Sequence, residues 1–164
     1  MTIRLTNEMR RIAINALLTQ TFEKREAKAA KASHVLGLRL FKKLLGPKYK
    51  LLAALPKGWA YTRSSVRFNI GGQSHTVYLP EQIPFPYEGK LDAVDARNPD
   101  GIALIAALAT ISEIKVERDT LKAKANQIVS RFTTVEALAK GWPLIAPFLP
   151  KDANPLPALR RLNS

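Results

Sequence analysis

Residues 101–132 read GIALIAALATISEIKVERDTLKAKANQIVSRF, and this stretch decides the fold. Its apolar residues recur with alternating spacings of four and three: Ala107, Ile111, Ile114, Leu121, Ala125, Ile128 and Phe132. Such a repeat lines up its members along one side of an α-helix. We therefore expect a long helix from Asp100 or Gly101 to about Arg131, with Arg118 filling the gap in the seam. The seam over 107–132 pairs with a second helix of the same chain or with another copy of the chain, as a homo-oligomer.

A second long helix is predicted nearer the N-terminus, from about Thr6 to Leu45. Thr6 or Asn7 can cap its first turn, and Gly46-Pro47 is a typical helix end. Apolar residues recur at helical spacing near both ends, while the middle is rich in Lys, Glu and Ala and is expected to be helical and solvated. Gly37 marks a break or a close contact.

The sequence between the two helices predicts a β-hairpin. Residues 65–70 and 75–79 alternate between apolar and polar, and Gly71-Gly72 between them is a turn signal. A short helix or turn is expected over 51–63. The proline-containing, acidic stretch from Pro80 to Pro99 is expected to be an extended connection.

The chain is expected to close with a short helix. Thr133-Thr134-Val135-Glu136 fits a capping box, and the helix should end near Gly141. We predict a single domain of the α+β class, mainly helical: two long antiparallel helices with a small β-hairpin insert and a short C-terminal helix. Its parts are a basic helix (1–46), a turn with hairpin and connection (47–100), a heptad helix (101–132), a short helix with an apolar end-piece (133–150), and a tail (151–164).

Positive charge is concentrated at the N-terminal end of the chain. Residues 1–63 hold 14 Lys and Arg against 3 Asp and Glu, a net charge of +11. Residues 64–100 have a net charge of −2 and residues 101–164 one of +4, which together give the +13 of the whole chain. A concentrated positive field attracts polyanions and accelerates their encounter. Nucleic acid and an acidic protein surface are therefore the expected partners, and a solvated helix face is the alternative interpretation.

The basic residues follow the first helix and continue past its end. A straight helix of that length spans roughly 60 Å, enough to follow phosphates along a stretch of DNA. No helix-turn-helix or zinc-finger pattern is present, so contacts independent of base sequence are expected. The candidate nucleic-acid-binding residues are Arg10, Arg11, Lys24, Arg25, Lys28, Lys31, Arg39, Lys42, Lys43, Lys48 and Lys50.

Aromatic residues lie among the basic ones beyond the first helix. Tyr49 stands between Lys48 and Lys50, and Trp59 and Tyr61 precede Arg63. Aromatic rings interleaved with cations can stack on nucleic-acid bases. For Trp59, however, we expect a place in the core rather than at the surface.

The sequence offers no recognisable catalytic cluster. The absence of cysteine excludes disulfides, thiolate metal sites and cysteine nucleophiles. The two histidines, His34 and His75, form no metal-binding motif, and Gly71-Gly72 is not part of a phosphate-binding loop signature. We expect no catalytic residue, no metal and no cofactor. No apolar run approaches the ~18 residues of a membrane helix, so no membrane partner is expected.

Three segments together resemble a known family. They are Ile3-Arg4-Leu5-Thr6 with the Lys/Glu/Ala helix, Leu55-Pro56-Lys57-Gly58-Trp59 before the hairpin, and a closing block, Thr133-Thr134-Val135-Glu136-Ala137-Leu138, Trp142-Pro143 and Pro147-Phe148-Leu149-Pro150. This order is similar to a family of small phage proteins, the fifth of the nucleotide-modification-associated domains. The resemblance covers nearly the whole chain. It implies a phage accessory protein grouped with genes that modify DNA bases, and it supplies no established catalytic residue.

Three hypotheses for function follow. The first is a non-enzymatic phage accessory protein that binds nucleic acid or nucleoprotein through its basic helical face. The second is a protein that binds a phage or host protein, as an inhibitor of a host factor or as a virion component. The third is a subunit of a DNA base-modification system. The expected location is the cytoplasm of the infected bacterial host, or the virion.

Overall fold

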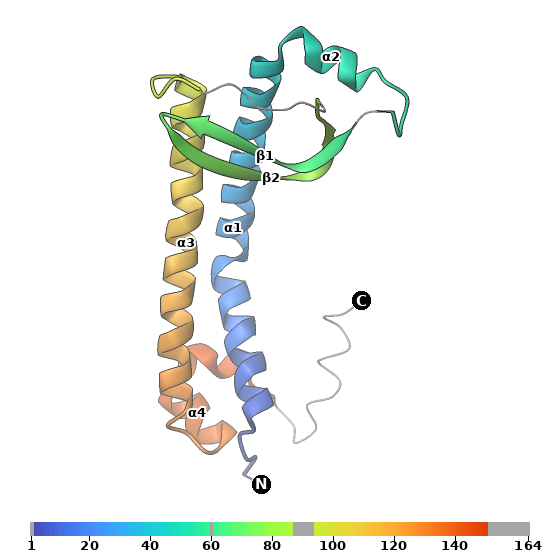
Figure 1. The fold of residues 1–164 in the computed structure, drawn as a ribbon. Helices are drawn as coiled ribbons and strands as arrows, with labels where there is room; N and C mark the ends of the chain where they lie inside the picture. Colours follow the sequence, from blue (N-terminus) through green and yellow to red (C-terminus); the bar gives the residue numbers. More distant parts are fainter. Residues whose placement is uncertain (1, 60, 87–93, 151–164) are drawn as a thin grey trace. The chain divides into compact units, whose positions relative to one another are not determined.

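A computed structural model describes residues 2–59, 61–86 and 94–150 (Figure 1). It is mainly helical, with one two-stranded antiparallel hairpin and a short C-terminal helix, which confirms the predicted α+β class. The elements in chain order are α1 (Asn7–Leu45), α2 (Pro47–Ala53), β1 (Thr62–Ile70), β2 (Gln73–Pro84), α3 (Pro99–Val129), α4 (Val135–Gly141) and the 3-10 helix η1 (Pro143–Phe148).

The chain divides into two compact units. Unit 1 comprises Met1–Arg25 and Ile114–Ser164, and unit 2 comprises Glu26–Glu113. Helices α1 and α3 each contribute one part to each unit. Within each unit the two helices lie side by side and run in opposite directions (Figure 1).

Both ends of α1 follow the sequence prediction. The Thr6 hydroxyl accepts a hydrogen bond from the Met9 N–H at 3.2 Å, as a capping residue does. Gly46 ends the helix with φ of 53°, a left-handed conformation that glycine adopts without strain. Helix α2 then begins directly at Pro47, so the short helix expected over 51–63 lies nearer the N-terminus than predicted. Proline is favoured there because the first helical turn needs no backbone donor.

The hairpin supplies the core of unit 2. Val66 pairs with Val77 and Phe68 with His75, and Gly71-Gly72 turns the chain with positive φ at both residues. The inward side chains join residues of α1 and α3 in one buried cluster, which includes Leu40, Phe41, Val66, Phe68, Val77 and Leu104. A Cβ built on Gly37 would lie 2.9 Å from Val77 Cγ1, so this glycine marks a close contact.

Strand β2 is longer than the sequence pattern indicated. It continues to Pro84, so the stretch 80–84, which we expected to be connection, belongs to the strand. Ile83 and Pro84 pair with Arg63 and Thr62 of β1 after an irregularity between Arg63 and Ser65. Such an irregularity shifts the register and lets the strand continue beyond it. Within the expected connection, residues 87–93 lie outside the described residues.

Helix α3 begins at Pro99, one residue before the predicted start. The Asn98 side chain caps it by accepting hydrogen bonds from the N–H groups of Asp100 and Gly101 at 3.0 and 3.2 Å. Every member of the predicted seam is buried or half-buried within the single chain. The homo-oligomer through this seam stays a prediction.

The N-terminal segment and α4 meet in unit 1. The backbone N–H groups of Leu5 and Val135 donate to the carbonyls of Thr133 and Ile3 at 2.9 and 3.0 Å. The capping box was predicted one residue too early, because Thr134 and not Thr133 caps α4 by accepting from the Ala137 N–H. Glu136 instead accepts a hydrogen bond from the Ile3 N–H at 3.0 Å, and this bond lowers the pKa of its carboxyl. The tail 151–164 lies outside the described residues.

Candidate nucleic-acid interface

The predicted nucleic-acid-binding residues all lie on α1 or α2, and all except Arg10 are exposed. Exposure alone does not make a cation available to a phosphate, because an internal partner competes for it. The structure separates the candidates by this criterion. Four of them have polar or ionic partners within the protein, namely Arg10, Arg25, Arg39 and Lys43.

Arg25 joins α1 to α3 within unit 1. Its guanidinium forms a two-pronged ion pair with Glu117, with Nη–Oε distances of 2.6 and 3.1 Å. The hydrogen bonds lower the pKa of Glu117 and raise that of Arg25. A bidentate pair of this kind fixes orientation as well as charge. Arg25 therefore already has an ionic partner on α3, which competes with a phosphate for its charge.

Arg39 and Lys43 share one carboxylate, Asp100, in unit 2. The Lys43 ammonium donates a hydrogen bond to Asp100, and an Arg39 Nη1 lies 3.7 Å from the other carboxylate oxygen. Asp100 stands in the first turn of α3, where the helix dipole also favours a negative charge. The hydrogen bond from Lys43 is the main cause of the lowered pKa of Asp100.

This arrangement gives the stability of unit 2 an acid dependence. The pKa of Asp100 is lower in the folded state than in the unfolded state, so its ionised carboxylate stabilises unit 2. This stabilisation is complete above the ordinary carboxyl pKa of about 3.9 and is lost as the pH falls through the lowered pKa of the folded state. When the pH is lowered from about 6 to about 3, we expect the melting temperature of Asp100→Asn to fall less than that of the wild type. Thermal denaturation followed by circular dichroism measures this difference, and equal losses in both proteins would contradict the assignment.

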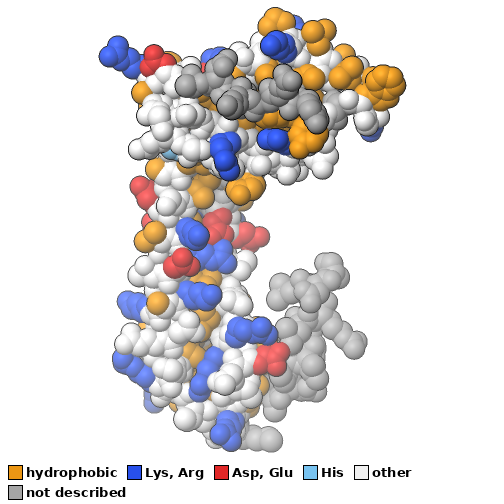
Figure 2. Space-filling model, viewed as in Figure 1, with side chains coloured by type: hydrophobic (Ala, Val, Ile, Leu, Met, Phe, Trp, Pro, Cys, Tyr) orange, Lys and Arg blue, Asp and Glu red, His pale blue; other side chains and the backbone are white. Residues whose placement is uncertain are grey.

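The other candidates have no ion pair with the described residues. Lys42 lies over the Tyr49 ring, with its Nζ 5.1 Å from the ring centroid. The remaining six are Arg11, Lys24, Lys28, Lys31, Lys48 and Lys50, and their charges are open to solvent. On the face of the molecule seen in Figure 2, blue Lys and Arg side chains follow the helices of unit 1 and outnumber the red acidic ones.

One groove gathers basic and amide groups within unit 1. It has a volume of about 400 Å³ and lies between the first turns of α1 and the last turns of α3. Its lining residues are Asn7, Arg10, Arg11, Ile14, Asn15, Lys122, Asn126, Val129 and Ser130. The lining therefore holds three cations and three carboxamides, and it holds no carboxylate.

Arg10 shapes the wall of this groove. Its Nη2 donates to the Phe132 carbonyl at 2.7 Å, and its Nη1 lies 3.4 Å from the Asn7 side-chain oxygen. Its Nε is buried and has no hydrogen-bond partner. The guanidinium is thus held in place by the protein, whereas Arg11 and Lys122 are exposed and carry charges that a ligand can neutralise.

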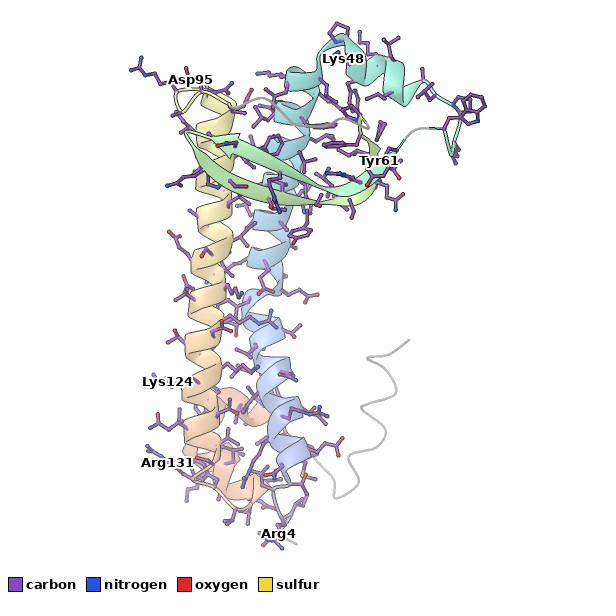
Figure 3. The ribbon with its side chains drawn as sticks, in the orientation of Figure 1. Arg4, Lys48, Tyr61, Asp95, Lys124 and Arg131 are labelled. Atoms are coloured by element: carbon purple, nitrogen blue, oxygen red, sulfur yellow. The ribbon has the colours of Figure 1, made fainter. Side chains whose placement is uncertain are left out.

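The sequence analysis missed the α3 side of the groove. Lys122, Asn126 and Ser130 follow one another at spacings of four, which places them on one strip of the helix beside the apolar seam. That spacing is present in the sequence, but the predicted sites were confined to residues 10–50, where the positive charge is concentrated. Lys124 of α3 and Arg131, just beyond the end of this helix, point away from α1 (Figure 3).

The groove suits an anion with several oxygen atoms. Guanidinium and ammonium groups are the usual donors to phosphate, and carboxamides add neutral hydrogen bonds.

In the described ranges, no three His, Asp or Glu side chains are grouped so as to hold a metal ion. No helix in the part of the chain that the structure describes is long and apolar enough to cross a membrane.

Comparison with known proteins gives the family. The model of nucleotide modification associated domain 5 matches residues 4–163. The chain belongs to this family. The match confirms the resemblance drawn from the three sequence segments and associates the protein with nucleotide modification. No curated protein and no solved structure matches the chain.

The match to nucleotide modification associated domain 5 covers both sides of the groove. Arg10 and Arg11 of α1 and Lys122 and Asn126 of α3 all lie inside the matched residues. The groove is therefore part of the family domain and not of an appendage.

Proposed function

We propose that this member of nucleotide modification associated domain 5 is a non-enzymatic nucleic-acid-binding protein, and that the groove of unit 1 contacts the phosphate backbone. The observation that carries the proposal is the composition of the groove, whose lining includes Arg11 and Lys122 and no carboxylate that would compete with an anion for them. The net charge of +13 supports it, because a charge of this sign draws polyanions toward the protein.

Binding by this groove is expected to be independent of base sequence. Contacts from Arg and Lys to phosphates fix the position of a protein on a duplex but carry no sequence information. Exposed cations elsewhere, among them Lys24, Lys28 and Lys31, add to the attraction. A protein with these properties acts as an accessory factor on phage DNA during base modification, in the cytoplasm of the infected bacterial host.

The salt dependence of binding tests this proposal. Each phosphate contact on a duplex releases about 0.9 counterion, so affinity falls steeply as salt rises. We expect fluorescence anisotropy with a labelled duplex to show at least a hundredfold loss of affinity between about 50 mM and about 300 mM salt. Two duplexes of unrelated sequence should give the same result. An affinity that is equal at both salt concentrations would exclude electrostatic contact with phosphates.

A further inference from the structure

The segment 47–59, which we name the α2 arm, exposes an unusual amount of apolar surface. Helix α2 contains no buried residue, and the exposed fractions of Leu51, Leu55 and Trp59 are 71%, 43% and 80%. Figure 2 shows hydrophobic side chains gathered over α2 and the turn after it. Single exposed apolar residues are common, but a group of them marks an interaction site.

Trp59 is presented by a defined turn and not by a loose loop. The Trp59 N–H donates to the Pro56 carbonyl at 3.0 Å, and Gly58 between them has a φ of 90°. A left-handed glycine at the third position is typical of a type II turn. The indole is therefore held outside the core, and little backbone entropy is lost when a ligand binds to it.

The rings of the neighbouring tyrosines are already covered by cations. The Lys42 ammonium lies over Tyr49, and the Arg63 guanidinium lies 5.2 Å from the centroid of Tyr61. The Trp59 ring has no such contact with the described residues. It is the aromatic surface of the α2 arm that is open to a ligand.

The charge of the α2 arm indicates the ligand. Residues 47–59 contain Lys48, Lys50 and Lys57 and no Asp or Glu. A fitting ligand thus combines negative charge with flat apolar faces. Single-stranded nucleic acid has both, because its bases are unpaired and its phosphates lie beside them, whereas a duplex hides the base faces.

We propose that the α2 arm binds single-stranded nucleic acid by stacking a base on Trp59 while Lys57, with Lys48 and Lys50, neutralises the adjacent phosphates. The proposal rests on the proposed function in taking the polyanion to be a nucleic acid. It adds a contact in unit 2 that distinguishes unpaired from paired strands, which the groove of unit 1 does not. A protein acting where DNA bases are modified would in this way recognise opened strands.

Trp59 fluorescence tests the proposal directly. The chain has two tryptophans, so Trp142→Phe leaves Trp59 as the only indole. Titration of this variant with a thymidine oligonucleotide should quench the emission as a base stacks on the ring. A matched duplex should quench it much less. No quenching by the oligonucleotide under conditions where it binds would overturn the proposal.

Affinity measurements supply the second part of the test. Trp59→Ala should weaken binding of the oligonucleotide about tenfold and leave duplex binding unchanged, and Trp59→Phe should retain most of the affinity. Tyr78→Ala removes another exposed aromatic ring, on β2, and should have no effect. Unchanged affinity in Trp59→Ala, or equal losses for both nucleic acids, would contradict the stacking role.

The two proposals fail in different ways. If duplex binding is salt-dependent but Trp59 is insensitive to the oligonucleotide, the inference about the α2 arm is wrong and the groove stands. If neither nucleic acid binds, the proposed function itself is wrong. A blue shift of Trp59 emission on vesicles of anionic phospholipid, without quenching by the oligonucleotide, would assign the arm to a lipid surface and overturn the proposal.

Discussion

The double variant Arg11→Ala/Lys122→Ala is expected to bind duplex DNA about sixtyfold more weakly than the wild type at about 0.1 M salt. The two side chains supply the exposed cations of the groove, one from each helix. Each phosphate contact contributes through the release of about 0.9 counterion, which at this salt concentration is worth roughly eightfold in affinity. Loss of two contacts multiplies the two factors.

The chain offers a matched control for this variant. Lys124→Ala/Arg131→Ala removes one lysine and one arginine as well, so the net charge changes equally. Both side chains point away from α1 (Figure 3). The control should lose only a fewfold affinity, through the weaker overall field. Equal losses in the two variants would mean that net charge, and not the groove, determines binding.

Phe41→Ala is expected to destabilise unit 2 by about 3–5 kcal/mol. Phe41 is fully buried, stacks on Phe85 with ring centroids 5.4 Å apart, and meets Tyr49 edge to face. The substitution removes the ring and leaves a cavity under the hairpin, and both effects lower stability. Urea denaturation followed by circular dichroism measures the loss.

Phe41→Leu is the control for this prediction. Leucine keeps apolar volume at the site, so it should cost clearly less than alanine. The exposed Tyr78→Ala should cost little, because its side chain is 72% exposed. A cost of less than about 1 kcal/mol for Phe41→Ala would contradict the packing described for unit 2.

Local signals predicted the elements of this fold well. The repeat of apolar residues in 101–132, the Thr6 cap and the Gly71-Gly72 turn each involve residues close in sequence, and each is confirmed by the structure. Ion pairs between residues far apart in sequence could not be predicted in this way. Arg25 and Glu117 are 92 residues apart, and Lys43 and Asp100 are 57 apart. No spacing rule connects such pairs, so cations that the protein uses internally were counted among the candidates.

Trp59 shows a different limit of sequence reasoning. We expected it in the core, and this was wrong, since Trp59 is 80% exposed. Whether a tryptophan after a Pro-Lys-Gly turn faces inward depends on where the turn lies against the rest of the fold. Only the α1 side of the candidate groove was predicted, for a similar reason. Arg10 and Arg11 were candidates because they lie in the most basic part of the sequence. Lys122 becomes a candidate only when the structure shows that it lines the same groove as residues of α1.

Protection of lysines from acetylation tests the central claim most directly, since it reports where a nucleic acid lies on the protein. Lys122 and Lys124 are exposed neighbours on α3, and only Lys122 lines the groove. The protein is treated with an acetylating reagent with and without a saturating duplex, and each site is quantified by mass spectrometry. Our account predicts that the duplex slows acetylation of Lys122 severalfold and leaves Lys124 unchanged. Equal protection of both lysines, or protection of Lys124 alone, would contradict it.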